Sequence, residues 1–124
     1  GILLYEVQQP GDITWRLYDW GRPRPLHLEQ ALAVARRDAA PFVEKFVEGT
    51  GRQKLIENQY FVLERLVLQE PLQVQSSRWE AWTVLEGQVQ VEDTEVSKGE
   101  TVLLNPGSRF IQGKAGVLLA SLPD

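Results

Sequence analysis

The chain has 124 residues, a formal net charge of -4 and no cysteine. Its hydrophobic and charged contents, 43% and 24%, are those of an ordinary folded domain and exclude an intrinsically disordered chain. The acidic balance argues against a nucleic-acid partner, which requires a basic surface, and the lack of cysteine excludes disulfides and thiolate metal sites.

No targeting or membrane segment is recognisable in the sequence. No apolar run approaches the ~20 residues that a membrane-spanning helix needs. The opening GILLYEV has no basic region and no cleavage site of a signal peptide. We therefore expect a soluble, cytoplasmic protein without a membrane partner.

The N-terminal segment is predicted to form two strands around a turn. Residues 2–8 are rich in branched and aromatic side chains, and the Pro-Gly-Asp sequence at 10–12 is typical of a turn. Residues 13–20 alternate in the period-two pattern of a strand. Arg16 falls on the more polar face of that strand, near Glu6 and Asp12 in sequence.

A helical region is predicted next. Residues 21–25 have loop composition, and Leu28, Leu32 and Ala35 then recur at helical spacing. The stretch 41–49 could form a second short helix that ends at a glycine. The polar residues 49–58 are predicted to be a connector, and a single histidine at position 27 is typical of a capping or packing role.

The remainder of the chain, from residue 59, is predicted to be all β. The expected strands cover 59–68, 72–75, 80–87, 88–93, 94–98, 100–107, 109–113 and 116–122, with glycines at 87, 99, 107, 113 and 116 marking the joints. Many short strands with regular turn signals indicate a sandwich or a jelly-roll barrel. The fold class is therefore mostly β.

The segment VLEGQVQVEDTEVSKGETVLLNPGSRF (84–110) resembles the cupin family of small jelly-roll barrels. Metal-binding cupins carry two histidines and a glutamate before the first glycine, and a further histidine after the Pro-Gly corner. Here no histidine is present at either place, and Phe110 stands near the second. Glu80 and Glu86 remain, but one or two carboxylates make a weak metal site. We expect no metal in this barrel.

The segments YEVQQPGDITWRLYDWGR (5–22) and RPLHLEQAL (24–32) resemble the small bacterial type of class I mannose-6-phosphate isomerase. That family consists of zinc enzymes built from two cupin barrels in one chain. The resemblance implies that residues 1–24 are the terminal strands of a catalytic barrel, 25–58 a helical linker, and 59–124 a metal-free C-terminal barrel.

The resemblance also implies roles for three residues. Arg16 matches the active-site arginine of the family, and Glu6 and Asp12 match acidic residues that line or support the same pocket. The family's zinc ligands match no position of this sequence, because they lie upstream. The implied substrate is a sugar phosphate, interconverted between mannose 6-phosphate and fructose 6-phosphate, and the isolated chain is expected to be inactive.

Other interpretations stay open at this stage. Arg16 could instead form a structural ion pair with Glu6 or Asp12. The chain could be a stand-alone, metal-free cupin used for binding or dimerisation, or one half of a site that a second chain completes. Strands 2–8 and 13–20 would leave exposed edges, so a homodimer through those edges is a further hypothesis.

Overall fold

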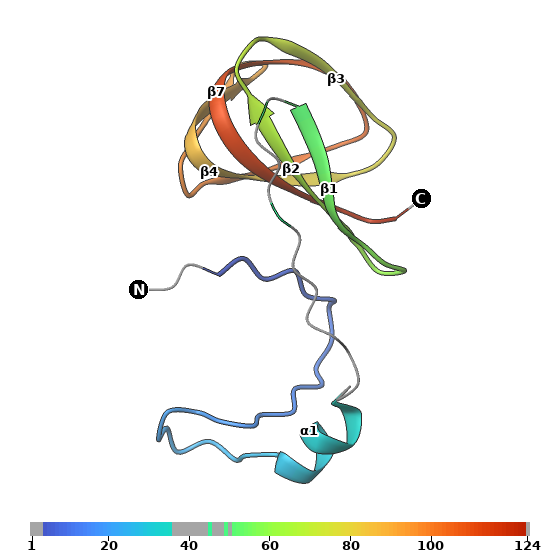
Figure 1. Cartoon of the computed structure of the whole chain (residues 1–124), viewed down its shortest axis with the longest axis vertical. Coiled ribbons are helices and arrows are strands. Elements are labelled where there is room, and N and C mark those ends of the chain that lie inside the picture. The colour runs from blue at the N-terminus through green and yellow to red at the C-terminus, as the bar shows by residue number, and fades with distance from the viewer. Residues whose placement is uncertain (1–3, 36–44, 46–48, 50, 124) are drawn as a thin grey trace. The chain divides into compact units, whose positions relative to one another are not determined.

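The computed structural model describes residues 4–35, 45, 49 and 51–123 (Figure 1). The chain divides into two compact units, which are described separately. One unit, Gly1–Val7 together with Glu44–Asp124, is called the barrel unit. The other, Gln8–Val43, is called the turn–helix unit.

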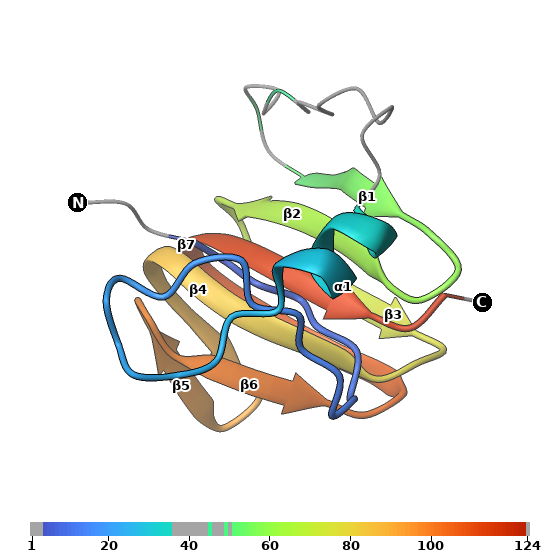
Figure 2. The same cartoon turned by 90° about the horizontal axis from the view of Figure 1, so that it is seen from below.

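The barrel unit is a seven-stranded antiparallel sheet whose strands curve around a common core (Figure 2). Its strands are β1 (Gly51–Glu57), β2 (Val62–Leu68), β3 (Leu72–Ser76), β4 (Glu80–Val91), β5 (Thr94–Ser97), β6 (Thr101–Leu104) and β7 (Gly107–Ser121). The hydrogen-bonded order is β1-β2-β7-β4-β5, with β3 also paired to β7 and β6 to β4.

The two long strands hold both halves of the barrel together. The beginning of β7, Gly107–Ile111, pairs with β3, whereas its end, Ala115–Ser121, pairs with β2. Strand β4 pairs with β7 along 111–121 and adds β6 and β5 at its two ends. Strands that pass from one half of a double sheet to the other are typical of a jelly roll. The mostly β fold class predicted from the sequence is confirmed.

The core of the barrel is built by the inward-facing residues of these strands. Alternation along β4 buries Glu80, Trp82 and Val84 on one face, each no more than 2% exposed. A register shift after Val84 lets the alternation resume with Val89. The buried apolar cluster is completed by Leu66, Leu68, Val74, Val91, Val96, Leu104, Ile111, Ala115, Val117 and Leu119.

The prediction that Gly87, Gly113 and Gly116 separate strands is wrong. All three lie inside β4 or β7, which run through them. Gly87 has a φ of 73°, and a Cβ there would overlap the carbonyl oxygen of Lys114 on the neighbouring strand. A Cβ on Gly113 would lie 2.5 Å from the carbonyl oxygen of Gln88. Gly87 and Gly113 therefore permit a close approach of two backbones rather than a turn.

The predicted connector at 49–58 also requires correction, because most of it is strand β1. This stretch is polar because β1 is an edge strand, which pairs with β2 and with no other strand among the described residues. Its charged side chains Arg52 and Lys54 form ion pairs with glutamates, so the strand lacks the apolar alternation that would identify it.

The N-terminal strands predicted at 2–8 and 13–20 are not formed over their described residues, 4–8 and 13–20. A strand requires a ladder of backbone hydrogen bonds to a neighbouring strand, and neither segment forms such a ladder in the part of the chain that the structure describes. The predicted helix is confirmed as α1 (Leu28–Val34), which buries Ala31. The second predicted helix, 41–49, lies almost entirely outside the described residues.

Candidate functional site

Arg16 lies in the turn–helix unit and is held by the segment that precedes α1. Its backbone N–H donates to Nδ1 of His27 at 3.2 Å, and the His27 N–H donates back to the Arg16 carbonyl at 2.8 Å. The Arg16 side chain donates from Nη1 to the carbonyl of Pro25 at 3.1 Å. Arg16 is thus fixed at both main chain and side chain.

A tight turn next to Arg16 brings a carboxylate and a second guanidinium together. Asp19 begins the turn, and the Arg22 N–H closes it by donating to the Asp19 carbonyl at 2.9 Å. Trp20 and Gly21 in the centre have φ values of 49° and 73°, both left-handed as in a type I′ turn. A tryptophan in this conformation is strained, and such strain is frequent at functional sites.

Asp19 is the charged centre of this unit. Its side chain is only 4% exposed and accepts from Nε of Arg24 at 2.6 Å and from Nη2 at 2.5 Å. These hydrogen bonds hold the pKa of Asp19 below its usual value, against the rise that burial alone causes. Nε of Arg16 lies 3.9 Å from the same carboxylate. Two guanidinium groups therefore share one anion, which leaves the group with a net positive charge.

The three residues that the sequence groups together fall into two units of the chain. Asp12 and Arg16 belong to the turn–helix unit, whereas Glu6 belongs to the barrel unit. Asp12 is exposed and forms no ion pair within the described ranges, whereas Asp19 is a carboxylate that lies next to Arg16 within the turn–helix unit. The grouping of Glu6, Asp12 and Arg16 in one pocket stays a prediction.

Sequence reasoning missed Asp19, although a signal for it is present. An aspartate is favoured at the first position of a turn, and Asp19 directly precedes Trp20-Gly21. The alternating pattern assigned it instead to the apolar face of a strand. His27 fits the predicted packing role, because its ring also makes an edge contact with Trp15, with 5.7 Å between ring centroids.

The barrel unit contains a second charged cluster, around Glu80. One oxygen of the Glu80 carboxylate accepts from Arg52 Nη2 at 2.6 Å, and the other accepts from the indole Nε1 of Trp82 at 2.8 Å. The same Arg52 nitrogen donates to Glu64 at 2.6 Å. Burial raises the pKa of Glu80, but the hydrogen bonds from Arg52, Trp82 and Ser76 together bring it below its usual value. The carboxylate is therefore ionised at neutral pH.

This cluster does not fit a metal ion. Glu80 is one of the two carboxylates that remain near the cupin metal positions, and both of its oxygens already accept hydrogen bonds. Phe110 is 49% exposed, and no three His, Asp or Glu side chains gather in any part of the chain that the structure describes. The positive charge next to Glu80 is supplied by Arg52. No step of a reaction is assigned to a metal held by these residues.

The described residues also contain no helix that is long and apolar enough to cross a membrane. Only α1 is helical among them, and it has seven residues.

Comparison with known proteins identifies the fold. No protein-family model matches the sequence, and no curated protein matches it significantly. Among solved structures, the chain is similar to the mannose 6-phosphate isomerase from Bacillus subtilis, with 21% identity and a TM-score of 0.67. The match covers 88% of this chain and 40% of that one, so the chain spans less than half the length of the isomerase.

Two smaller proteins are similar to the chain as well. An RmlC-like cupin family protein from Methanocaldococcus jannaschii, with a double-stranded β-helix fold, has 10% identity and a TM-score of 0.52, over 72% of this chain and 94% of that one. A cupin-2 domain containing protein from Shewanella frigidimarina has 14% identity and a TM-score of 0.50, over 63% and 85%. At such identities the likeness shows the fold: this chain is a cupin-type jelly roll.

Proposed function

We propose that the chain is the C-terminal part of a mannose-6-phosphate isomerase. One observation carries the proposal, namely the extent of the match to the Bacillus subtilis enzyme. A match over 88% of 124 residues includes about 109 of them, whereas the strands from Gly51 to Ser121 span only 71. The likeness therefore reaches beyond the barrel strands into the part of the chain that precedes them, where Arg16 lies.

In this proposal Arg16 stabilises the reacting oxygens of the sugar. Aldose–ketose isomerisation removes a proton next to a carbonyl and passes through an enediol-type intermediate, so negative charge develops on oxygen. A guanidinium is permanently charged and planar, and can donate to two adjacent oxygens. The hydrogen bonds of Arg16 to Pro25 and His27 would hold it in place without reorganisation during the reaction.

The remaining roles are proposals of the same kind. Asp12 and Glu6 are the candidates for carrying the proton or supporting the pocket, and Glu6 belongs to a different unit from Arg16. The zinc of the parent enzyme would be held by residues outside these 124. The chain alone is then inactive, and turnover by the purified 124-residue chain with added zinc would contradict this proposal.

The test is an activity assay on the protein encoded by the complete reading frame that contains this sequence. We expect Arg16→Gln to lower kcat/KM for mannose 6-phosphate about 10²–10³-fold, the usual effect of removing one oxyanion stabiliser. Lys98→Gln, which removes a charge from an exposed turn of the barrel unit, is the control and should leave activity unchanged. An Arg16→Gln variant as active as the wild type would reject the role of Arg16.

A second candidate function is a stand-alone, metal-free cupin that binds a partner or a ligand. It is favoured by the two small cupin structures, which this chain matches over 94% and 85% of their lengths. The same assay separates the two candidates, because a protein without any isomerase activity from the complete reading frame would favour the binding module. A homodimer of the chain stays a hypothesis, which light scattering would test.

A further inference from the structure

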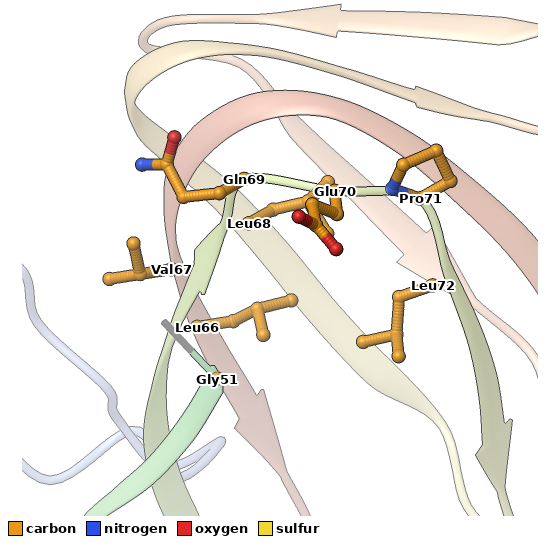
Figure 3. A pocket seen from close by; sticks show the side chains of 8 residues that line it. All are labelled: Gly51, Leu66, Val67, Leu68, Gln69, Glu70, Pro71 and Leu72. Carbon is orange, nitrogen blue, oxygen red and sulfur yellow. The ribbon is translucent and has the colours of Figure 1, made fainter. Parts of the chain in front are cut away.

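Two neighbouring cavities open between β2 and β3 of the barrel unit. The larger, about 320 Å³, lies at the corner between these strands and is lined by Gly51, Leu66, Val67, Leu68, Gln69, Glu70, Pro71 and Leu72 (Figure 3). The smaller, about 210 Å³, is lined by Arg52, Leu66, Leu72, Gln73, Val74, Gln75 and Trp82. Leu66 and Leu72 line both, and Figure 3 shows them facing each other across the larger cavity. The two cavities are therefore neighbours, and together they are called the β2–β3 cleft.

The deep wall of the smaller cavity consists of core side chains. Leu66 is 2% exposed, Val74 is 7% exposed and Trp82 is fully buried. The pairing of the strands explains the opening, because β2 pairs with β1 and β7, whereas β3 pairs only with β7. A small molecule in the cleft would contact apolar side chains on its inner side, which is the usual composition of a ligand site.

The smaller cavity also presents hydrogen-bond donors that the described residues leave unused. Arg52 lines it, and both of its hydrogen bonds are made by Nη2, to Glu64 and Glu80. Its Nε and Nη1 have no partner in the described part of the chain. Gln75 lines the same cavity from the exposed face of β3, and its side-chain amide has no partner there either. The cavity thus offers a guanidinium held by two carboxylates, and an exposed amide at its edge, which suits a ligand rich in oxygen acceptors.

The charge around the cleft decides between an anionic and a neutral ligand. The single positive charge of Arg52 is already shared by two carboxylates, Glu64 and Glu80. Glu70 adds a further negative charge at the larger cavity. This net negative charge opposes a phosphate or a carboxylate. Hydroxyl and ether oxygens accept hydrogen bonds without bringing a charge.

We propose that the β2–β3 cleft binds an uncharged polyol of monosaccharide size, whose oxygens accept hydrogen bonds from Arg52 and Gln75 and whose carbon face packs on Leu72 and Val74. The volumes lie at or below the lower end of the range for small-molecule sites, roughly 300–1,000 Å³, which excludes a long oligosaccharide. The residues that line the cleft all belong to the barrel unit, and the proposal does not depend on the proposed isomerase function.

The test is a titration of the ¹⁵N-labelled 124-residue chain with methyl α-D-mannopyranoside, followed by NMR. This probe has neither a free carbonyl nor a phosphate, so it cannot be a substrate of an isomerase. We expect saturable chemical-shift changes of the Arg52 Nε–H and the Gln75 side-chain amide. The dissociation constant should lie in the millimolar range, because a ligand of this size makes few contacts. Mannose 6-phosphate should bind more weakly than the methyl glycoside, because the cleft is negative.

Three variants make the result specific. Gln75→Ala removes an exposed donor and should weaken binding about five-fold, the effect of roughly one lost hydrogen bond. Gln112→Ala, at an exposed position of β7 outside the cleft, is the matched control and should bind as the wild type does. Leu72→Trp should fill the cleft and abolish binding without disturbing the buried core. Absence of saturation, equal binding by the Gln75 and Gln112 variants, or tighter binding of mannose 6-phosphate would overturn the proposal.

Discussion

Replacing Arg52 with glutamine tests the most strongly coupled charge in the barrel. The substitution keeps a polar side chain on β1 but removes the guanidinium that bridges Glu64 and Glu80 at 2.6 Å from each. Glu80 is 2% exposed and would keep only the hydrogen bonds of Trp82 and Ser76. A buried carboxylate that loses its counter-ion costs far more than an exposed one.

The magnitude follows from the burial of the two partners. Breaking a fully buried ion pair by removing one partner costs about 3–5 kcal/mol of unfolding free energy. The Arg52 side chain is 32% exposed, so water would screen part of the remaining charge. The bond from Trp82 Nε1 also persists in the variant. We therefore expect Arg52→Gln to lower the free energy of unfolding at pH 7 by about 2–3 kcal/mol.

The pH dependence has a definite sign. In the wild type the pKa of Glu80 is lowered, so its contribution to stability is present above its unfolded pKa and is lost as pH falls through the folded pKa. In the variant, burial acts on Glu80 without the guanidinium, so its pKa rises above the usual value. The penalty is then relieved as the carboxyl protonates. The stability difference between wild type and variant should shrink on acidification from pH 7 to below the unfolded pKa.

Urea unfolding of the chain, followed by tryptophan fluorescence at both pH values, measures these differences. Lys54→Gln is the matched control, because Lys54 lies on the same strand and pairs with Glu57 where both side chains are 54% exposed. That substitution should change stability little. An Arg52→Gln variant no less stable than Lys54→Gln, or a loss that does not depend on pH, would refute the reasoning about a buried charge.

Two other outcomes follow from the geometry. Gly87→Ala should lower the melting temperature of the barrel much more than Gly99→Ala does. Both glycines have positive φ, but only at Gly87 would a Cβ overlap a neighbouring backbone. Equal losses of stability in the two variants would contradict the importance of this close backbone contact. Asp19 has a lowered pKa, so the local structure it stabilises should be present above its unfolded pKa and lost as pH falls through the folded pKa. The Nε–H signal of Arg24, followed by NMR, should therefore shift and exchange faster with water on acidification. A signal that does not change as pH falls through the folded pKa of Asp19 would contradict the pairing of Asp19 with Arg24.

Elements that follow simple patterns could be predicted from the sequence. Strand β2 is rich in branched apolar residues, β3 alternates apolar and polar residues, and the helix at Leu28 has apolar residues at helical spacing. The glycines were the main source of error, because a glycine required for a turn and one required for close backbone contact look alike in sequence. Gly99 and Gly107 do lie at strand junctions, whereas Gly87 lies within a strand.

The charged clusters could not be predicted, for a different reason. Arg52 and Glu80 are 28 positions apart, and nothing local to either residue reveals the other. Their partnership results from the order of strands in the sheet. Strand β1 could not be recognised because its residues are polar. In a sequence, polar side chains that form ion pairs in the fold look the same as those that face water. The position of Asp19 could more easily be predicted, because the turn that it begins is formed by residues adjacent in sequence.

The pairing of β7 has a consequence for how the barrel can be made. This strand is the last of the seven, and it is hydrogen-bonded to β2, β3 and β4. During synthesis the earlier strands therefore leave the ribosome with their main pairing partner still missing. Local hairpins such as β1–β2 and β4–β5 can form early, but the barrel closes only after Ser121 has been added. Until then, the unpaired edges are exposed to other nascent chains.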